Sequence, residues 1–124
     1  MILVRIIMNV LPEKQKEVMQ TLLSMNDTAG KVKGCLSYDV FCDTDGKTVF
    51  NLIEEWETRE DLYRHIRSEK FSVLLGTKSL LAKPLEIKFH TVAHTEGEEV
   101  VNALRGKGTS KKDLLEPTPN IISS

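Results

Sequence analysis

The stretch CLSYDVFCDTDGKTVFNLIEEWE, residues 35–57, decides the fold of this chain. Cys35 to Cys42 is rich in β-branched and aromatic residues, and Thr44-Asp45-Gly46 follows with the composition of a hairpin turn. Lys47 to Glu57 then returns as the partner strand. One face of this second strand carries three large apolar residues, Phe50, Leu52 and Trp56. The sequence therefore predicts two antiparallel strands joined by a tight turn.

Two further elements precede the hairpin. Residues Ile2 to Val10 alternate between two faces, and both faces carry apolar side chains, which predicts a mostly buried strand. Pro12 fits the first position of a helix, because the N–H that it lacks would have no partner there. The helix is indicated by apolar side chains at helical spacing, Val18, Leu22 and Met25. Gly30 and Gly34 end this segment.

A helical region and a last strand follow the hairpin. Thr58 and Asp61 have the spacing of a capping box and begin a second helix, which runs through Leu62 and Ile66. Residues 68–72 break or bend it, and residues 73–81 are apolar enough for further helical turns. Residues 86–94 are predicted to form the final strand, which the pattern extends to His94.

The predicted order of strand, helix, strand, strand, helix, strand is that of the ferredoxin-like α+β fold. In this fold an antiparallel sheet carries its helices on one face. With 124 residues, the chain is long enough for one domain, which we place at residues 1–94. Residues 95–124 are predicted to form a C-terminal extension, with a short helix at Glu98–Arg105 and a loose tail that ends in Ile121-Ile122.

The first strand also predicts a homodimer. Ile6 and Met8 lie on one of its faces, while Leu3 and Ile7 lie on the other. Because one helix layer covers only one face of a sheet, the second apolar face needs a partner.

Composition narrows the classes of partner. Seventeen Lys and Arg against eighteen Asp and Glu give a net charge of −1, which argues against nucleic-acid binding and gives no polybasic surface for a membrane. The chain has no apolar run of the length that a membrane-spanning helix needs, and its apolar N-terminal stretch does not have the pattern of a signal peptide. We therefore expect a cytoplasmic protein without a membrane partner.

The two cysteines agree with that expectation. On a single strand, the seven steps from Cys35 to Cys42 span roughly 23 Å, whereas a disulfide needs Cα atoms within about 7 Å. Two free thiols are typical of a reducing compartment.

The residues indicate neither a metal site nor a nucleophile. His90 and His94 lie four apart on the predicted last strand, which separates them by about 13 Å, too far to share one zinc ion. No serine lies in a Gly-x-Ser-x-Gly elbow. Glu54 and Glu55 point to opposite faces of a strand, and we expect this glutamate run at a strand end to be solvated.

Trp56 and His65 remain as candidate site residues. His65 lies on or beside the helix face that must cover the sheet, and an imidazole there can act as a base near neutral pH. The alternative is a partly buried histidine with one hydrogen bond. Trp56 offers a flat wall to an aromatic substrate, and Tyr38 on the neighbouring strand can donate a hydrogen bond to a phenolate or a peroxide.

Three segments carry a family resemblance: Gly34-Cys35-Leu36-Ser37-Tyr38-Asp39-Val40, Glu55-Trp56-Glu57, and Leu62-Tyr63-Arg64-His65 with Phe71 behind it. Over residues 2–94 the chain resembles the antibiotic biosynthesis monooxygenase (ABM) domain family, in particular its quinol monooxygenases. The resemblance implies a dimeric α/β barrel with a pocket between the sheet and the helices of each subunit. Several members oxidise phenolic polyketides or quinols with molecular oxygen and use no flavin, haem or metal.

The resemblance also implies roles for single residues. His65 and Tyr38 become the candidate catalytic residues, and the candidate substrate contacts are Trp56, Asn51 and Phe50. Asn51 lies on the strand face opposite Trp56. Other members degrade haem, but His65 stands where that branch has a tryptophan and Leu75 where it has a haem-ligating histidine, although Asn9 fits its asparagine. This argues against haem chemistry.

Two hypotheses follow for the function. The first is a cofactor-independent monooxygenase that oxidises a small phenolic or quinol substrate. The second is a non-catalytic dimeric module that binds a small ligand or a protein partner, or an isomerase of the same family. A closed apolar pocket with His65 and Tyr38 converging on it would favour the first, and a pocket filled by side chains would favour the second.

Overall fold

The computed structural model describes residues 1–29 and 32–106, except for the side chains of residues 26–29. This part of the chain belongs to two compact units, residues 1–91 and the residues from Val92 onward. The first unit contains, in chain order, β1 (Ile2–Asn9), a short 3₁₀ turn η1 (Pro12–Lys14), α1 (Gln15–Ala29), β2 (Cys35–Cys42), β3 (Val49–Trp56), α2 (Arg59–Ile66), α3 (Glu69–Leu75), η2 (Gly76–Leu80) and β4 (Glu86–Thr91). The second unit contains α4 (Glu98–Leu104). The apolar pair Ile121-Ile122 lies outside the described residues.

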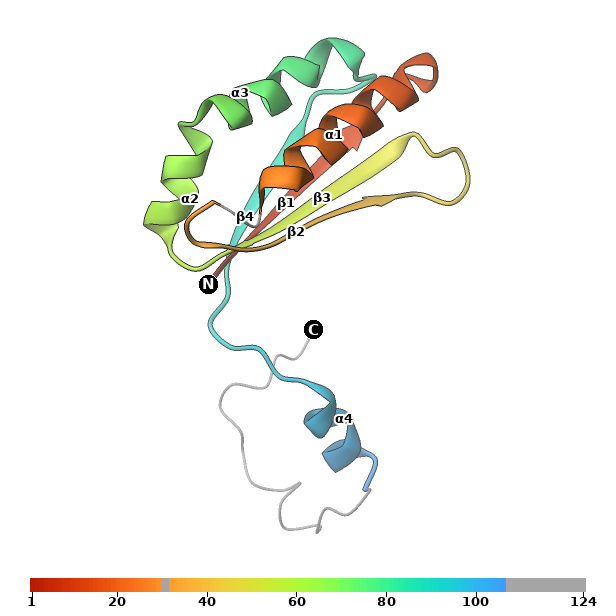
Figure 1. Cartoon of the computed structure of the whole chain (residues 1–124). Helices are drawn as coiled ribbons and strands as arrows, with labels where there is room; N and C mark the ends of the chain where they lie inside the picture. The colour runs from red at the N-terminus through yellow and green to blue at the C-terminus, as the bar shows by residue number, and fades with distance from the viewer. Residues whose placement is uncertain (30–31, 107–124) are drawn as a thin grey trace. The chain divides into compact units, whose positions relative to one another are not determined.

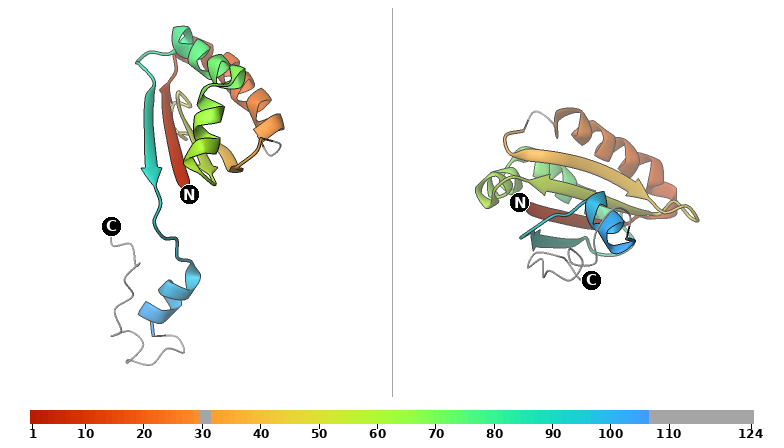
Figure 2. Two further views of the ribbon diagram at one scale, coloured as in Figure 1. Left: turned by 90° about the vertical axis from the view of Figure 1, so that its left-hand side faces the viewer. Right: turned by 90° about the horizontal axis from the view of Figure 1, so that it is seen from below.

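The four strands form one antiparallel sheet in the order β2-β3-β1-β4. Figures 1 and 2 show α1, α2 and α3 together on one side of this sheet. This is the predicted ferredoxin-like α+β fold, and the prediction is confirmed. No helix in the described part of the chain is long and apolar enough to cross a membrane.

Alternation along the two central strands separates the faces of the sheet. The covered face of β1 carries Ile2, Val4, Ile6 and Met8, all buried. These side chains pack with Val18 and Leu22 of α1 and with Leu62, Phe71 and Leu74 of the helices that follow β3. Burial of such side chains is the main stabilising contribution to the fold, about 1.5–3 kcal/mol for each large apolar side chain.

Side-chain caps fix where the helices over β3 begin. The hydroxyl of Thr58 accepts a hydrogen bond from the Asp61 N–H at 3.1 Å, as the capping-box spacing predicts. The hydroxyl of Ser68 accepts one from the Phe71 N–H at 3.3 Å, so the break predicted within residues 68–72 falls at Ser68 and a new helix begins at Glu69. Because each has its own cap, α2 and α3 are two separate helices over the sheet.

A glycine brings the preceding turn against the first turn of α2. Gly34 has a φ of +82°, and a Cβ at this position would overlap the carboxyl group of Asp61. Only glycine both adopts this positive φ readily and has no Cβ to clash with Asp61. This close approach positions the turn at residues 32–34, which carries Lys33, beside α2.

Two details differ from the sequence predictions. β4 ends at Thr91, so His94 lies beyond the strand on which we expected it, and only His90 belongs to β4. In the hairpin, the residue with positive φ is Lys47 (54°), one position after the glycine of the turn. The Asp43 carboxylate accepts hydrogen bonds from the N–H groups of Gly46 and Val49, at 3.1 and 2.9 Å, and holds this wider turn.

Candidate functional site

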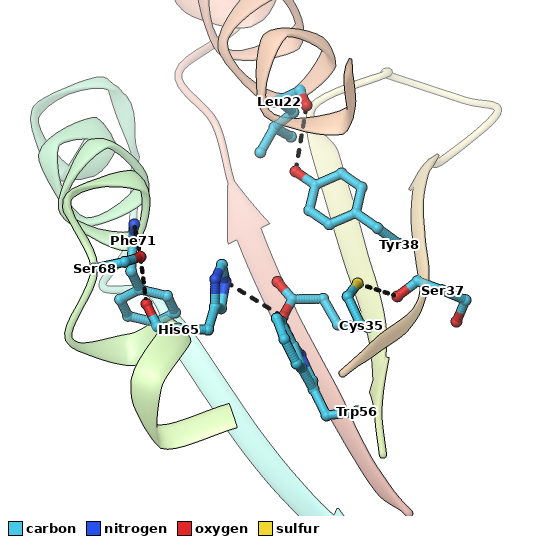
Figure 3. A network of polar contacts seen from close by, with 9 residues as sticks. Leu22, Cys35, Ser37, Tyr38, Trp56, His65, Ser68 and Phe71 are labelled. Atoms are coloured by element: carbon cyan, nitrogen blue, oxygen red, sulfur yellow. Dashed lines mark hydrogen bonds and ion pairs between the residues drawn. The ribbon is translucent and has the colours of Figure 1, made fainter. Parts of the chain in front are cut away.

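His65 is buried in the last turn of α2, at 6% exposure. Its ring lies against Trp56 of β3, with ring centroids 4.6 Å apart and planes inclined by 30°. Phe71 of α3 meets the same imidazole edge-on, with centroids 5.5 Å apart. Figure 3 shows His65 between these two aromatic rings. Three elements therefore hold the imidazole in one orientation.

A carboxylate completes this cluster. Glu54 of β3 is fully buried, and its Oε1 accepts a hydrogen bond from the indole N–H of Trp56 at 2.8 Å. The Nε2 atom of His65 lies 3.6 Å from the same oxygen. Glu54 Oε2 and His65 Nε2 are buried and have no hydrogen-bond partner among the described residues. Such groups cost stability and are often found at functional sites.

The expectation that the glutamate run is solvated is therefore wrong for Glu54. The alternation of β3 predicts the burial of Glu54, because Glu54 lies two residues after Leu52 and two before Trp56, on the face covered by helices. Glu55 points the other way, where its carboxylate accepts a hydrogen bond from the Ser37 hydroxyl at 2.7 Å. The expectation that these two neighbours cannot cooperate at one site fits this geometry.

Burial governs the protonation of this cluster. It lowers the pKa of His65 to about 4, and the charge of Lys70 contributes in the same direction. Burial also raises the pKa of Glu54, against the effect of the hydrogen bond from Trp56. At neutral pH His65 is therefore an uncharged imidazole, which has a lone pair to accept a proton.

Tyr38 is directed elsewhere. Its hydroxyl donates a hydrogen bond to the carbonyl oxygen of Leu22 in α1 at 3.2 Å, and Figure 3 shows the hydroxyl pointing toward that helix. Burial and the nearby Glu54 raise the pKa of Tyr38, so the phenol keeps its proton. The sequence placed Tyr38 and His65 at one site, whereas the hydroxyl of Tyr38 is bonded to α1.

The structure separates Phe50 and Asn51 from this cluster. Phe50 is fully buried in the core, further along the covered face of β3. Asn51 lies on the open face, as its position in the alternation of the strand predicts. Its Oδ1 accepts a hydrogen bond from Arg5 at 3.3 Å. There it lines a shallow hollow of about 520 Å³ that Phe41 also lines. Their roles as substrate contacts stay predictions.

A cavity of about 220 Å³ opens beside His65. Its lining comes from the turn after α1, from α2 and from the start of α3: Val32, Lys33, Asp61, Arg64, His65, Ser68 and Lys70. Trp56 and Phe50 are not part of this wall. A larger apolar hollow of about 600 Å³ lies near the end of α3 and is lined by Leu75, Leu81 and Leu85, among others. We take the smaller cavity as the candidate site, because His65 borders it.

Neither the cysteines nor the other histidines line this cavity, although Cys35 pairs with Trp56 across β2 and β3. Cys35 and Cys42 are both free and half-buried, as their separation on one strand predicts. Nε2 of His94, in the second unit, lies 3.1 Å from the Glu96 carboxylate. Among the side chains that the structure describes, those of residues 1–25 and 32–106, there is no group of three His, Cys, Asp or Glu arranged to hold a metal ion.

Comparison with known proteins adds relatives to this geometry. A curated uncharacterized protein of Synechocystis, sll1783, is 29% identical over 86 residues, which cover 68% of this chain and 58% of the relative. The chain thus spans little more than half the length of that relative. A conserved protein from Methanosarcina mazei is 30% identical, with a TM-score of 0.67 over 72% of this chain and 89% of its own.

Two further solved structures share the fold. A candidate antibiotic biosynthesis monooxygenase from Nitrosomonas europaea has a TM-score of 0.70 at 17% identity, over 76% of this chain and all of its own. Another, from Deinococcus radiodurans, has a TM-score of 0.72 at 18% identity, over 78% and 97%. The family model for antibiotic biosynthesis monooxygenases matches residues 1–74, which include β1 to β3, α2 and His65. With more than half of its length matched, this chain belongs to the antibiotic biosynthesis monooxygenase family.

Proposed function

We propose that this protein is a monooxygenase that oxidises a small phenolic or quinol substrate with molecular oxygen and needs no cofactor. The observation that carries the proposal is the buried, neutral His65 at the edge of a cavity, with the Glu54 carboxyl group 3.6 Å from its Nε2. Family membership supports the same class of reaction.

Deprotonation is the step that such a site serves. Triplet oxygen reacts slowly with a neutral phenol, so the enzyme must first form the electron-rich phenolate. His65 accepts the phenolic proton. The pKa of His65 is low because burial removes the solvent that would stabilise the imidazolium. A phenolate formed beside the imidazolium stabilises it in place of that solvent. The base therefore becomes stronger when the substrate ionises next to it.

Glu54 acts in this proposal as a positioning residue. Its carboxyl group is held by the indole N–H of Trp56 and lies near His65 Nε2. In its ionised form it stabilises the imidazolium that follows proton transfer. Trp56 holds the imidazole from behind. Tyr38 would have to leave its hydrogen bond to the Leu22 carbonyl in order to donate to a phenolate or a peroxide.

The reaction balances without an external reductant. Hydroquinone and one molecule of oxygen give hydroxybenzoquinone and one molecule of water. A C–O bond forms on the ring, the O–O bond breaks, and the substrate supplies all four electrons that reduce the two oxygen atoms. One oxygen atom enters the product and the other leaves as water.

We also propose a cytoplasmic homodimer. The helices described here cover one face of the sheet, and the other face exposes Phe41 at 53% together with the half-buried Leu3, Ile7 and Ile53. A second copy would remove this apolar surface from water. The two free cysteines support a reducing compartment.

One observation favours the alternative of a non-catalytic binding module. Trp56 and Phe50 are packed to 1% and 0% exposure, and the remaining cavity of about 220 Å³ is smaller than the roughly 300–1,000 Å³ of typical ligand pockets. A small ligand would fit this space and be retained rather than converted. An isomerase would use the same base without consuming oxygen.

Oxygen consumption distinguishes these functions. Protein treated with a chelator and free of flavin is mixed with a panel of hydroquinones and dihydroxynaphthalenes, and oxygen uptake is followed with an electrode. A parallel reaction under ¹⁸O₂ is analysed by mass spectrometry. We expect uptake with at least one substrate and a single labelled atom in its product. A panel that is bound or isomerised without oxygen uptake would refute the monooxygenase.

A further inference from the structure

The larger apolar hollow, of about 600 Å³, lies at the other end of the helices from His65. It is bordered by the end of α3, by η2 and by the loop that leads to β4, and Figure 1 shows α2 and the end of α3 near opposite ends of the sheet. Its volume is within the roughly 300–1,000 Å³ of typical ligand pockets. Its size therefore suits a small-molecule ligand, at a place apart from the proposed proton transfer.

Leucine side chains form most of the apolar lining of this hollow. Leu75, the last residue of α3, is 45% exposed. Leu81 and Leu85 are half-buried, and both also pack against the core of the first unit. A concave apolar surface that is open to water is typical of a ligand-binding groove. The lining therefore favours a ligand with an extended apolar part.

Backbone contacts fix the loop that forms one wall of the hollow. The Ala82 N–H donates a hydrogen bond to the Asn9 carbonyl oxygen at 2.7 Å. Leu81 forms an isolated β-bridge with Val10, and its N–H donates to the carbonyl oxygen of Lys78 at 3.3 Å. These contacts tie the loop to the end of β1. The hollow is thus formed before a ligand arrives, so binding requires little ordering of the protein.

The charged side chains among the described residues of the lining are two exposed lysines, Lys78 of η2 and Lys83 of the loop. Neither ammonium group has an ion pair or a hydrogen bond within residues 1–25 and 32–106. Glu86 follows the loop, but it pairs with Ile7 of β1, so alternation directs its carboxylate to the open face of the sheet. The hollow therefore combines an apolar lining with two available cations.

We propose that this hollow binds a medium-chain fatty acid, with the alkyl chain on the leucines and the carboxylate between Lys78 and Lys83. The inference goes beyond the proposed function, because His65 and the cavity beside it take no part. Lysine suits such a ligand, since its methylene stem covers apolar surface while its ammonium group stays in water. Burial of the alkyl chain provides affinity, and the charges fix the direction of the chain.

Equilibrium binding to the full chain tests this inference. Calorimetry compares octanoate, decanoate and dodecanoate with decanol and decylammonium, all at concentrations below those at which micelles form. We expect the affinity of the acids to rise about two- to fourfold for each added CH₂. Decanoate should bind at least tenfold more tightly than decylammonium, and less tightly as salt is added. No binding of the acids, or equal affinities for decanoate and decylammonium, would overturn the inference.

Two variants locate the site. Lys78→Gln with Lys83→Gln should lose at least tenfold in affinity for decanoate and keep its affinity for decanol. Ala82→Trp, at an exposed position of the lining, fills the hollow and should abolish the binding of both ligands. Lys16→Gln with Lys47→Gln removes the same charge from exposed positions outside the hollow and is the matched control. Decanoate binding that either test variant leaves unchanged, with wild-type circular dichroism, would contradict the assignment.

A second copy of the chain is the competing occupant of the hollow. Light scattering on a sizing column compares the wild type with Ala82→Trp in the absence of fatty acid. We expect equal masses, because the proposed dimer uses the open face of the sheet, whereas α3 and η2 border the hollow. A lower mass for Ala82→Trp would show that another copy covers the hollow and would overturn the inference.

Discussion

The two faces of β3 carry different kinds of residue and lie in different environments. The face under the helices is buried to 0–1% exposure and carries Phe50, Leu52, Glu54 and Trp56. The open face is half-buried and carries Val49, Asn51, Ile53 and Glu55. Two adjacent glutamates thus end on opposite sides of one strand.

The contrast between these glutamates shows what the covering helices add. Glu55 has the Ser37 hydroxyl as a hydrogen-bond donor in a half-buried position, as a surface carboxylate commonly does. Glu54 has the Trp56 indole on one oxygen, while its other oxygen is buried without a described partner. The covered face therefore holds a candidate proton-transfer site, and the open face is suited to assembly.

The substitution His65→Ala is expected to have the largest effect, because it removes the proposed base from the covered face. Loss of a general base typically lowers the rate by about 10²–10⁴-fold, and we expect turnover of a quinol to fall by about 10²-fold or more. Steady-state oxygen uptake measures it. His94→Ala, in the second unit, is the matched control and should keep wild-type turnover. A loss below tenfold at His65 would mean that the histidine is structural.

Ile7→Glu tests the open face. If a second copy covers Ile7, the new carboxylate is buried without a partner, and we expect the dimer to weaken by about 3 kcal/mol, or about 100-fold in Kd. Light scattering on a sizing column should report about twice 14.0 kDa for the wild type and 14.0 kDa for the variant. A wild-type monomer at micromolar concentration would refute the dimer.

The low pKa of His65 makes stability depend on pH. The unfolded imidazole takes up a proton near pH 6.5 and the folded one only near pH 4, so its contribution is complete above 6.5 and is lost as the pH falls toward 4. Glu54 acts in the opposite sense, because its raised pKa gives stability below about pH 4.5 that is lost as the pH rises through its folded value. The charge of Lys70, on α3, also lowers the pKa of the imidazole.

The variant His65→Leu removes the histidine contribution and keeps that of Glu54. Between pH 7 and pH 4, we expect the free energy of unfolding of the wild type to fall by about 2–3 kcal/mol more than that of His65→Leu. Urea unfolding at pH 7.0, 5.5 and 4.0 measures the difference. Parallel pH curves for the two proteins would show that the imidazole titrates normally in the folded state.

Trp56→Phe is expected to have a smaller effect. It removes the indole hydrogen bond to Glu54 and part of the ring surface that packs against the imidazole, but leaves His65 in place. We expect KM for a quinol to rise a few-fold while kcat changes by less than twofold. The opposite pattern, with kcat falling and KM constant, would assign Trp56 to the chemical step instead of binding.

Removal of residues 95–124 should have the least effect. The core of the first unit is formed by residues before Thr91, so we expect its free energy of unfolding to stay within about 0.5 kcal/mol of the full chain. Urea unfolding of the shortened chain should remain cooperative. A weaker dimer with an unchanged core would indicate that the extension docks on the partner, and loss of cooperative unfolding would move the domain boundary.

Much of the fold follows from local patterns in the sequence. Alternation along residues 2–10 and 49–56 predicts both faces of the sheet, and the capping spacing at Thr58 predicts the start of α2. These signals are local because a strand repeats every two residues and a cap spans one helical turn. The family motif around Trp56 and His65 also lies within a short stretch of sequence.

The sequence alone therefore determined the order of the elements, the face on which each residue of β1 and β3 lies, and the candidate histidine. Only the tertiary structure decided that Glu54 is buried against His65, that Tyr38 bonds to Leu22, and that Lys33 and Lys70 share one cavity. Each of these contacts joins different elements of the fold. Their geometry depends on how the helices cross the sheet, and no local pattern encodes that crossing.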